Sequence, residues 1–596
     1  MNNNKDTLVG KVISINGNRI SVKMSESLKS TMPIINGLVY RVGQIGSFLR
    51  IPLGYANLYG IVTQVGADAI PESLKEIALQ EYERNFSTRW MSLVLVGERV
   101  GNKFERGVTQ FPTAEDEVHL VTLDDLNIIY GGFDENNSIT VGNISVSESL
   151  PAKIELDKLV TRHCAIVGST GSGKSNTVAV MLESIAKGEF KSARILLIDP
   201  HGEYDETLNN YSKVFKVKAD KSKGQSELHI PFWALPFDEL MRSFPGNLND
   251  QQKDYVRAKI LEKKINSIQY LKNKPNEAAI TSDSPIPFSL KQLWFELDDF
   301  ERQTFRENRK PETVILKSQG NPDQLKSNEY EPASLGSGSP FLNLQAKGIL
   351  GFLDGMRNRI IDQRFKFLYE PGGFMPDLTG KVSNDLDYLL LEWLGHDKTV
   401  TILDLSGVPS IIMSSISGSL LKIMYDALFW GQNLPVGGRK QPLLLVLEEA
   451  HSYLKAGENS ISSRTIQTIA KEGRKYGVGL LLVTQRPTEL DETVLSQCGT
   501  LIALRMTNKG DRGHVSAAVQ DELCDMMALL PSLRTGEGLI MGEGVKIPSR
   551  VKFEKISKAP RSVDPEVSKE WRKERPDRKE SDFETTVDLW RNQKLN

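Results

Sequence analysis

Cysteine is scarce in this chain, and its scarcity excludes two kinds of fold. The 596 residues contain 3 cysteines, which lie far apart as Cys164, Cys498 and Cys524. No Cys-x-x-Cys pair occurs among them, so neither a disulfide framework nor a zinc ribbon is expected. Few and unpaired cysteines are typical of a reducing compartment, and we therefore expect a cytoplasmic protein.

Long hydrophobic runs and an excess of one charge are also missing. The longest apolar runs, such as 443–447, are far shorter than the roughly 20 residues that cross a bilayer. The first residues, MNNNKDTLVGKV, do not resemble a secretory leader, and we expect no membrane partner. Lys plus Arg is 74 and Asp plus Glu is 76, which gives a formal net charge of −2. This balance excludes a basic coat over the whole protein but allows a local basic channel for nucleic acid.

The order of strand and helix patterns divides the chain into five parts, and its length allows about three or four domains. Short alternating strands with Gly and Asn turns predict a small β-barrel over 1–150. Buried-type strands alternate with helices over 151–235 and again over 391–552, which predicts two parts of one parallel sheet. Residues 236–390 interrupt this alternation as a mostly helical insertion, with a polar loop over about 306–340. Residues 553–596 form a densely charged tail or arm that we expect to pack on a neighbour.

A phosphate-binding loop follows the first strand of the predicted sheet. Residues 168–175, Gly-Ser-Thr-Gly-Ser-Gly-Lys-Ser, match the pattern GxxxxGK[ST]. Glycines let successive backbone N–H groups point at one anion, and the helix that follows adds its positive end. Lys174 places a charge on the β- and γ-phosphates, and the Ser175 hydroxyl can bind Mg²⁺. The motif therefore predicts a site for ATP and Mg²⁺.

Two acids end a later strand of the same predicted sheet. Glu448 and Glu449 directly follow the apolar run 443–447. The carboxyl end of a parallel strand faces the crevice where such sheets bind ligands. We assign Glu448 to the magnesium ion and Glu449 to the attacking water. Without the phosphate loop, two exposed acids that open a helix would explain the pattern equally well.

Other strand ends carry polar residues whose roles the sequence leaves open. The segment from Asp199 to Tyr204 holds ionisable groups that can order water, metal or DNA, or that form a hydrogen-bonded loop. Gln485 follows another strand and can sense the γ-phosphate, or it can be a structural amide. Arg474 lies in KEGRKYG. Its guanidinium suits the charge of a phosphoryl group transferred across a subunit boundary, although spacing alone favours a surface arginine.

Six segments in order resemble the HerA family, within the HerA–FtsK class of RecA-like P-loop motors. They are RHCAIVGSTGSGKSNT, IDPHGEY, TILDLSG, LVLEEAH, KEGRKYG and LLVTQRP. The resemblance implies an α/β fold: a RecA-like P-loop core with an N-terminal small β-barrel and a helical insertion. It also implies an ATPase that assembles as a homohexameric ring and moves double-stranded DNA through a central pore. Bacterial relatives of this kind act in anti-phage defence with an effector, either a nuclease or a sirtuin-like NAD-consuming enzyme, which we expect to dock on the barrel.

The resemblance also assigns roles to particular residues. It implies that Lys174 and Ser175 belong to the Walker A motif, that Glu448 and Glu449 are the Walker B pair, and that Gln485 is a sensor. Arg474 matches an arginine finger that acts in trans on the neighbouring subunit, and Arg162 matches a basic residue that touches phosphates in cis. The implied nucleotide-binding set is Gly168, Ser169, Thr170, Gly171, Ser172, Gly173, Lys174, Ser175, Asn176 and Arg162.

The DNA contacts are the least defined part of the prediction. The basic helix over 253–274 can meet a phosphate backbone, although a solvated charged face is the simpler interpretation. The loop over 454–464, with Lys455 and Arg464, can line a pore or be an ordinary surface loop. A different class of function also fits the sequence: a hexameric scaffold that regulates a bound effector in response to ATP without moving DNA.

Overall fold

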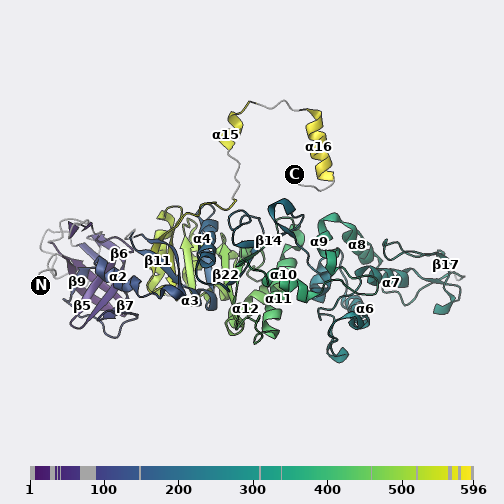
Figure 1. Ribbon diagram of the computed structural model, residues 1–596, viewed down its shortest axis with the longest axis horizontal. Coiled ribbons are helices and arrows are strands. Elements are labelled where there is room, and N and C mark those ends of the chain that lie inside the picture. Colours follow the sequence, from purple (N-terminus) through teal and green to yellow (C-terminus); the bar gives the residue numbers. More distant parts are fainter. Residues whose placement is uncertain are drawn as a thin grey trace.

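The protein is described from a computed structural model in which the N-terminal barrel, the core sheet and the insertion follow one another along the long axis (Figure 1). The structure describes residues 7–26, 34–35, 38–39, 42–67, 89–145, 149–307, 310–336, 338–457, 460–518, 521–561, 567–574 and 579–591. Cys524 has no described side chain, whereas Cys164 and Cys498 are free thiols.

The N-terminal strands close into a barrel, as the sequence predicts. Six strands follow the order β2-β1-β9-β5-β6-β7, a pairing of β2 with β7 closes the ring, and β8 extends it from β7. The strands are β1 (Leu8–Asn16), β2 (Arg19–Met24), β5 (Phe48–Leu53), β6 (Ala56–Ala67), β7 (Arg89–Val100), β8 (Lys103–Arg106) and β9 (Glu117–Leu120), beside the short pair β3 (Ile34–Ile35) and β4 (Leu38–Val39). The β1–β2 turn contains Gly17 at φ 60°, a left-handed conformation that glycine adopts readily. Alternate strand residues such as Val9, Val22 and Leu58 fill the interior.

The core is a mixed sheet of twelve strands. Its order is β11-β10-β25-β24-β23-β12-β22-β21-β13-β20-β14-β15. The strands from β23 to β15 run parallel, and the four on the other side are antiparallel. Their bounds are β10 (Ser138–Ile144), β11 (Pro151–Glu155), β12 (Cys164–Val167), β13 (Arg194–Asp199), β14 (Ser212–Lys216), β15 (Ser226–Glu227), β20 (Val400–Asp404), β21 (Leu443–Leu447), β22 (Val478–Thr484), β23 (Thr500–Leu504), β24 (Glu537–Gly542) and β25 (Ser549–Phe553).

One predicted barrel strand belongs to this core sheet instead. The expectation of a barrel over 1–150 included the strand that starts at Ser138, but β10 pairs with β11 and β25. Its apolar residues Ile139 and Val141 are buried in the same core as helix α4 (Lys174–Lys187), and Ser184 Oγ of α4 donates to Thr140 O at 2.8 Å. Alternation of apolar and polar residues identifies a strand but not the sheet that it joins.

Helices cover the core sheet, and the longest is also the most apolar. They are α3 (Leu156–Thr161), α4, α11 (Ser410–Trp430), α12 (Ile461–Glu472), α13 (Glu492–Ser496) and α14 (Lys509–Ala517). Gly418 lets α11 approach α12 closely, because a Cβ there would lie 2.5 Å from Ile461 Cγ2. By length and composition alone α11 could cross a membrane, but 56% of its most apolar window is buried in the protein, as in a core helix.

The insertion is mostly helical, as the sequence predicts. Its helices are α5 (Phe237–Arg242), α6 (Asp250–Ser267), α7 (Leu290–Arg302), α8 (Leu350–Ile361), α9 (Lys366–Tyr369) and α10 (Leu386–Leu394). The expected polar loop carries two small sheets, β16 (Thr304–Phe305) with β19 (Phe341–Leu342) and β17 (Leu316–Ser318) with β18 (Glu329–Tyr330). Trp294 fixes α7 against α8 by donating to Leu353 O at 2.9 Å. The tail holds α15 (Val567–Arg572) and α16 (Glu580–Arg591), which have no buried residues (Figure 1).

The barrel joins the core through helix α2 (Leu123–Gly131). Asp125 of α2 is buried and accepts hydrogen bonds from Tyr59 Oη at 2.8 Å and from Arg99 Nη1 at 3.1 Å, both on barrel strands. Its carboxylate also accepts from Thr122 N and Oγ1, which caps the helix. One carboxylate therefore ties the barrel wall to the first turn of α2.

Candidate nucleotide-binding and catalytic site

Five parallel strands bring most of the predicted site residues, but not the two arginines, to one edge of the core sheet. Strand β22 lies between β12 and β21, with β13 and β20 beyond β21. Their carboxyl ends are followed by the phosphate loop at Gly168, Glu448, Gln485 and the acids Asp199 and Asp404. Binding at the carboxyl ends of strands is the general rule for such sheets.

The phosphate loop has the backbone conformation that its glycines permit. Gly171 lies at φ 71° and Gly173 at φ 104°, both in the left-handed region. Gly168 has no room for a side chain, since a Cβ there would lie 2.6 Å from Ser172 Oγ and 2.8 Å from Leu504 Cβ. The loop thus curls tightly into the amino end of α4, where unpaired N–H groups can bind an anion.

Lys174 begins helix α4 and faces the acids of the neighbouring strands. Its side chain is largely buried, and Nζ donates to Ser169 O at 3.2 Å. Burial lowers the pKa of Lys174, while the charges of Glu449, Glu448 and Glu203 act in the opposite direction. The lysine and the three acids therefore share one site.

Glu448 is buried at the end of β21 and held by two tyrosine hydroxyls. Tyr204 donates to Glu448 Oε1, and Tyr453 donates to the Glu448 carbonyl oxygen. Burial raises the pKa of Glu448 to about 8, the hydrogen bond from Tyr204 opposes the rise, and the Asp199 carboxylate adds to it. A carboxylate in such surroundings needs a cation to stabilise its charged form.

Glu449 differs from its neighbour in conformation and in charge. Its φ of 47° is unusual for a residue with a side chain and turns the chain sharply after the strand. His451 Nδ1 lies 3.2 Å from Glu449 Oε2. Burial acts to raise the pKa of Glu449, but His451, Lys174 and His201 outweigh it and lower the pKa. Glu449 is therefore a carboxylate at neutral pH and can accept a hydrogen bond from water.

Gln485 touches the phosphate loop directly. It follows β22, and its Oε1 accepts a hydrogen bond from Thr170 Oγ1 at 2.6 Å. The predicted sensor thus contacts the third residue of the loop, and this hydrogen bond connects the phosphate-binding loop to the end of the neighbouring strand β22.

The donor set fits a nucleotide with Mg²⁺. In the described part of the chain, Ser172 Oγ is buried and has no hydrogen-bond partner, and buried Glu449 Oε2 has only the ion-pair contact with His451. Lys174 supplies positive charge, while Ser175 and Glu448 offer the hard oxygen ligands that Mg²⁺ prefers. These groups match what phosphate oxygens and their metal need.

The two predicted arginines lie at the opposite edge of the sheet. Arg474 is exposed in a 3₁₀ helix (Gly473–Tyr476) that precedes β22, whereas the phosphate loop follows the end of the parallel strand β12. Arg162 precedes β12 and lies 3.5 Å from Glu543. The expected contact of Arg162 with phosphates in cis is therefore wrong, because the whole of β12 separates it from the loop of its own chain.

The Asn176 side chain contacts the chain that follows strand β25. Its Nδ2 donates to Glu554 O at 2.7 Å, and its Oδ1 accepts from Ile556 N at 3.1 Å. The C-terminal strap (residues 554–561) thus crosses the first turn of α4. At its far end, Arg561 N donates to Glu203 O at 3.0 Å. The Asn176 side chain holds the strap, and its backbone N–H in the first turn of α4 stays a predicted part of the nucleotide-binding set.

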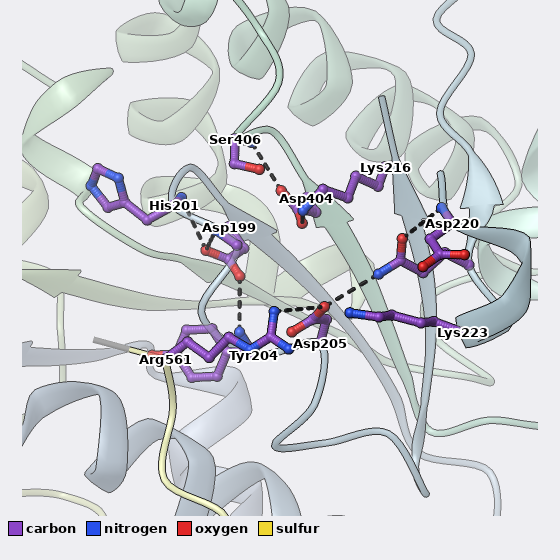
Figure 2. Close-up of polar contacts among 12 residues, drawn as sticks. Asp199, His201, Tyr204, Asp205, Lys216, Asp220, Lys223, Asp404, Ser406 and Arg561 are labelled. Carbon is purple, nitrogen blue, oxygen red and sulfur yellow. Dashed lines mark hydrogen bonds and ion pairs between the residues drawn. The ribbon is translucent and has the colours of Figure 1, made fainter. Parts of the chain in front are cut away.

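The loop after β13 is a hydrogen-bonded structure built around Asp199 (Figure 2). Burial raises the pKa of Asp199 to about 7, and the neighbouring Asp404 adds to the rise. Lys216 pairs with Asp404 at 2.6 Å. Among the described residues no cluster of three or more His, Cys, Asp or Glu side chains is arranged to hold a metal ion. Of the two interpretations of this segment, the structure favours the loop.

The basic helix predicted over 253–274 is shorter in the structure, where α6 ends at Ser267 and a 3₁₀ turn ends at Tyr270. Four of its basic side chains contact protein groups. Lys264 is buried and donates to Ser282 O at 2.7 Å and Ser284 O at 2.6 Å. Lys259, Lys263 and Arg257 form ion pairs with nearby acids. These contacts favour the simpler interpretation, and contact of this helix with DNA stays a prediction. In the loop over 454–464, Lys455 and Arg464 are exposed, which leaves their role open as a prediction.

Two family models match consecutive parts of the chain. The model for the helicase HerA central domain matches residues 139–424, and the model for the helicase HerA-like C-terminal region matches residues 401–588. The chain belongs to the HerA helicase family. It is accordingly a P-loop ATPase, with the Walker residues at the carboxyl edge of the core sheet.

Individual relatives are similar along most of their length. The DNA double-strand break repair helicase HerA of Saccharolobus solfataricus is 28% identical over 550 residues, which cover 90% of this chain and 93% of that protein. The HerA of Pyrococcus furiosus is 25% identical over 455 residues, which cover 73% and 72%. The VirB4 structure from Thermoanaerobacter pseudethanolicus has a TM-score of 0.46 at 12% identity, over 72% of this chain and 99% of that one. The coupling protein TrwB with ADP and Mg²⁺ has a TM-score of 0.40 at 13% identity, over 73% and 93%.

Proposed function

We propose that this protein is an ATP-driven motor that moves double-stranded DNA through a homohexameric ring. The observation that carries the proposal is the division of the site between two edges of one sheet. The phosphate loop, Glu448, Glu449 and Gln485 lie at the carboxyl edge, and Arg474 lies at the amino edge. A ring supplies the missing arginine from the next subunit. The name of the HerA relatives, double-strand break repair helicases, supports DNA as the polymer.

Each residue of the carboxyl edge has a distinct part in hydrolysis. Lys174 and the backbone N–H groups of the loop bind the phosphates and neutralise their charge. Ser175 and Glu448 would hold Mg²⁺, which supplies further positive charge to the β- and γ-phosphate oxygens. Glu449, held as a carboxylate, orients the attacking water and accepts its proton. Gln485 detects the loss of the γ-phosphate through its contact with Thr170.

Arg474 completes the site only from a neighbouring copy. Strand β22 has 7 residues. At about 3.3 Å per residue it separates Arg474 from the carboxyl edge of its own chain by roughly 20 Å. That separation exceeds the reach of an arginine side chain, so the finger serves the subunit whose phosphate loop packs against it. Heterologous contacts of this kind form a ring when the rotation between successive subunits closes.

The proposal is tested by ATP turnover with and without double-stranded DNA. We expect DNA to stimulate the wild-type protein. The Glu449→Gln variant should bind ATP and lose turnover by about 10²-fold or more, because the water loses its base. Glu489→Gln is the matched control, since Glu489 is a partly exposed acid that pairs with Arg486 at 2.8 Å. Turnover of Glu449→Gln at the wild-type rate would contradict the assignment.

The barrel supports a second part of the proposal, an effector partner in anti-phage defence. Among the described residues its most exposed large apolar side chains are Tyr55, Val100 and Phe111, which are 66%, 49% and 51% accessible. Tyr55 precedes Ala56, which pairs with Val100 on the neighbouring strand, and contiguous exposed apolar side chains are typical of binding surfaces. We propose that a nuclease or a NAD-consuming enzyme docks there. If substitution of Phe111 by Asp abolishes copurification of the effector while DNA leaves ATP turnover unchanged, the protein is an ATP-responsive scaffold rather than a motor.

A further inference from the structure

Tyr204 joins two parts of the site that are far apart in the sequence. It lies in the loop after β13, and its hydroxyl donates a hydrogen bond to Glu448 Oε1 at the end of β21. Both side chains are buried, with Tyr204 0% and Glu448 6% exposed. Among the described residues, Tyr204 is the hydrogen-bond donor to the Glu448 carboxylate. The contact therefore fixes one carboxylate oxygen and leaves the other, Oε2, to a further partner.

The loop that carries Tyr204 is itself held rigidly (Figure 2). Asp199 Oδ1 accepts hydrogen bonds from His201 N at 3.2 Å and Gly202 N at 2.8 Å, and its Oδ2 accepts from Tyr204 N at 3.2 Å. Gly202 lies at φ 70°, and a Cβ there would lie 2.9 Å from Asp404 Oδ2. Asp199 thus sets the backbone of the loop, Asp404 packs against Gly202, and the Tyr204 ring starts from a defined position.

We propose that Tyr204 is a positioning residue for the magnesium site: it holds the Glu448 carboxylate in one orientation, with Oε2 available to the metal. The inference rests on the metal role proposed for Glu448. A glutamate has several rotatable bonds, and a buried one without a donor loses both orientation and hydrogen-bond energy. Partners that orient a metal ligand typically change metal affinity by about 10- to 100-fold when they are removed.

The test uses Tyr204→Phe, which removes the hydroxyl and keeps the ring. Binding of a fluorescent ATP analogue is titrated in EDTA and at increasing Mg²⁺ concentrations. The measured quantity is the ratio of the affinity in Mg²⁺ to the affinity in EDTA, followed as a function of the Mg²⁺ concentration. We expect Tyr204→Phe to bind the analogue normally in EDTA and to need about tenfold more Mg²⁺ for half-maximal enhancement. Turnover should show the same shift in its Mg²⁺ dependence. Because the ratio compares folded molecules of one preparation, a loss of folded protein does not change it.

Tyr369→Phe is the matched control. Tyr369 is 1% exposed, and its hydroxyl donates to Ser243 Oγ at 2.7 Å within the insertion. The control makes the same chemical change at equal burial, and we expect its Mg²⁺ response to equal that of the wild type. A shift of the same size in both variants would mean that a lost buried hydrogen bond acts generally, which overturns the inference.

Glu448→Gln separates the inference from the function on which it rests. If Glu448→Gln shifts the Mg²⁺ response and Tyr204→Phe does not, the positioning role is wrong and the metal role stands. If Glu448→Gln leaves the Mg²⁺ response unchanged, both the metal role and the positioning role are wrong. All these measurements are made without DNA, so they do not depend on whether the protein moves DNA.

Discussion

Mixing two inactive variants tests whether Arg474 acts on a neighbouring subunit. Lys174→Ala removes the phosphate-binding lysine at the carboxyl edge of the sheet, and Arg474→Ala removes the cation at the amino edge. Loss of an arginine finger typically costs about 10³-fold or more in turnover, so each variant alone should be nearly inactive. A finger that acts in trans lets the two defects complement each other in a mixed ring.

The size of the recovery follows from the composition of the ring. In rings assembled at random from equal amounts, about one site in four joins an intact phosphate loop to an intact arginine of the next subunit. We therefore expect about a quarter of the wild-type turnover per subunit. If Arg474 served its own chain, every site in the mixture would lack one group and no turnover would return.

The assay needs proof that mixed rings have formed. Each variant carries a different affinity tag, and two successive purifications isolate rings that contain both. Lys475→Ala, at an exposed neighbour of Arg474, is the control and should turn over ATP at close to the wild-type rate. Doubly purified rings with no more turnover than the separate variants would refute the reasoning from the two sheet edges.

Three further predictions concern single contacts. Asn176→Ala should leave nucleotide affinity unchanged and increase proteolysis near Glu554, because its amide holds the C-terminal strap; a loss of ATP affinity measured by titration would contradict this. Thr170→Val removes the hydrogen bond to Gln485, worth about 1 kcal/mol, and should slow turnover about fivefold with ATP affinity retained; unchanged turnover would argue against a sensor. Burial lowers the pKa of Lys264 to about 7. The unfolded chain therefore holds this proton more tightly, and stability rises with pH from about 7 towards 10.5. Melting curves of the wild type should show this rise relative to Lys264→Met, and parallel curves would contradict it.

The sequence predicts those features of the site that depend on residues next to one another along the chain. The phosphate loop and Glu448 can be identified because each follows an apolar strand directly. The short motif determines the backbone conformation, and the strand determines the position in the sheet. Gln485 follows in the same way, since parallel strands place their ends at one edge. The same rule, applied to the strand that Arg162 precedes, would have placed that arginine at the far edge.

Other features depend on contacts between distant segments. Tyr204 stands in a segment that sequence analysis singled out, but its partner Glu448 lies 244 positions away. Lys264 resembles any surface lysine of a basic helix until the carbonyl groups of Ser282 and Ser284 surround it. The strand that starts at Ser138 alternates like its barrel neighbours and joins another sheet. Neither the periodicity of apolar residues nor a short motif predicts these contacts, because they form only when distant segments pack together in the folded chain.

Displacement of a third strand from duplex DNA tests the central claim most directly. A labelled oligonucleotide bound as a triplex is released when a motor moves along the duplex beneath it. We predict release by the wild-type protein with ATP and Mg²⁺, and none by Glu449→Gln or without ATP. Failure of the wild-type protein to release the oligonucleotide, while it hydrolyses ATP at a rate that DNA does not change, would contradict the account of an ATP-driven DNA motor.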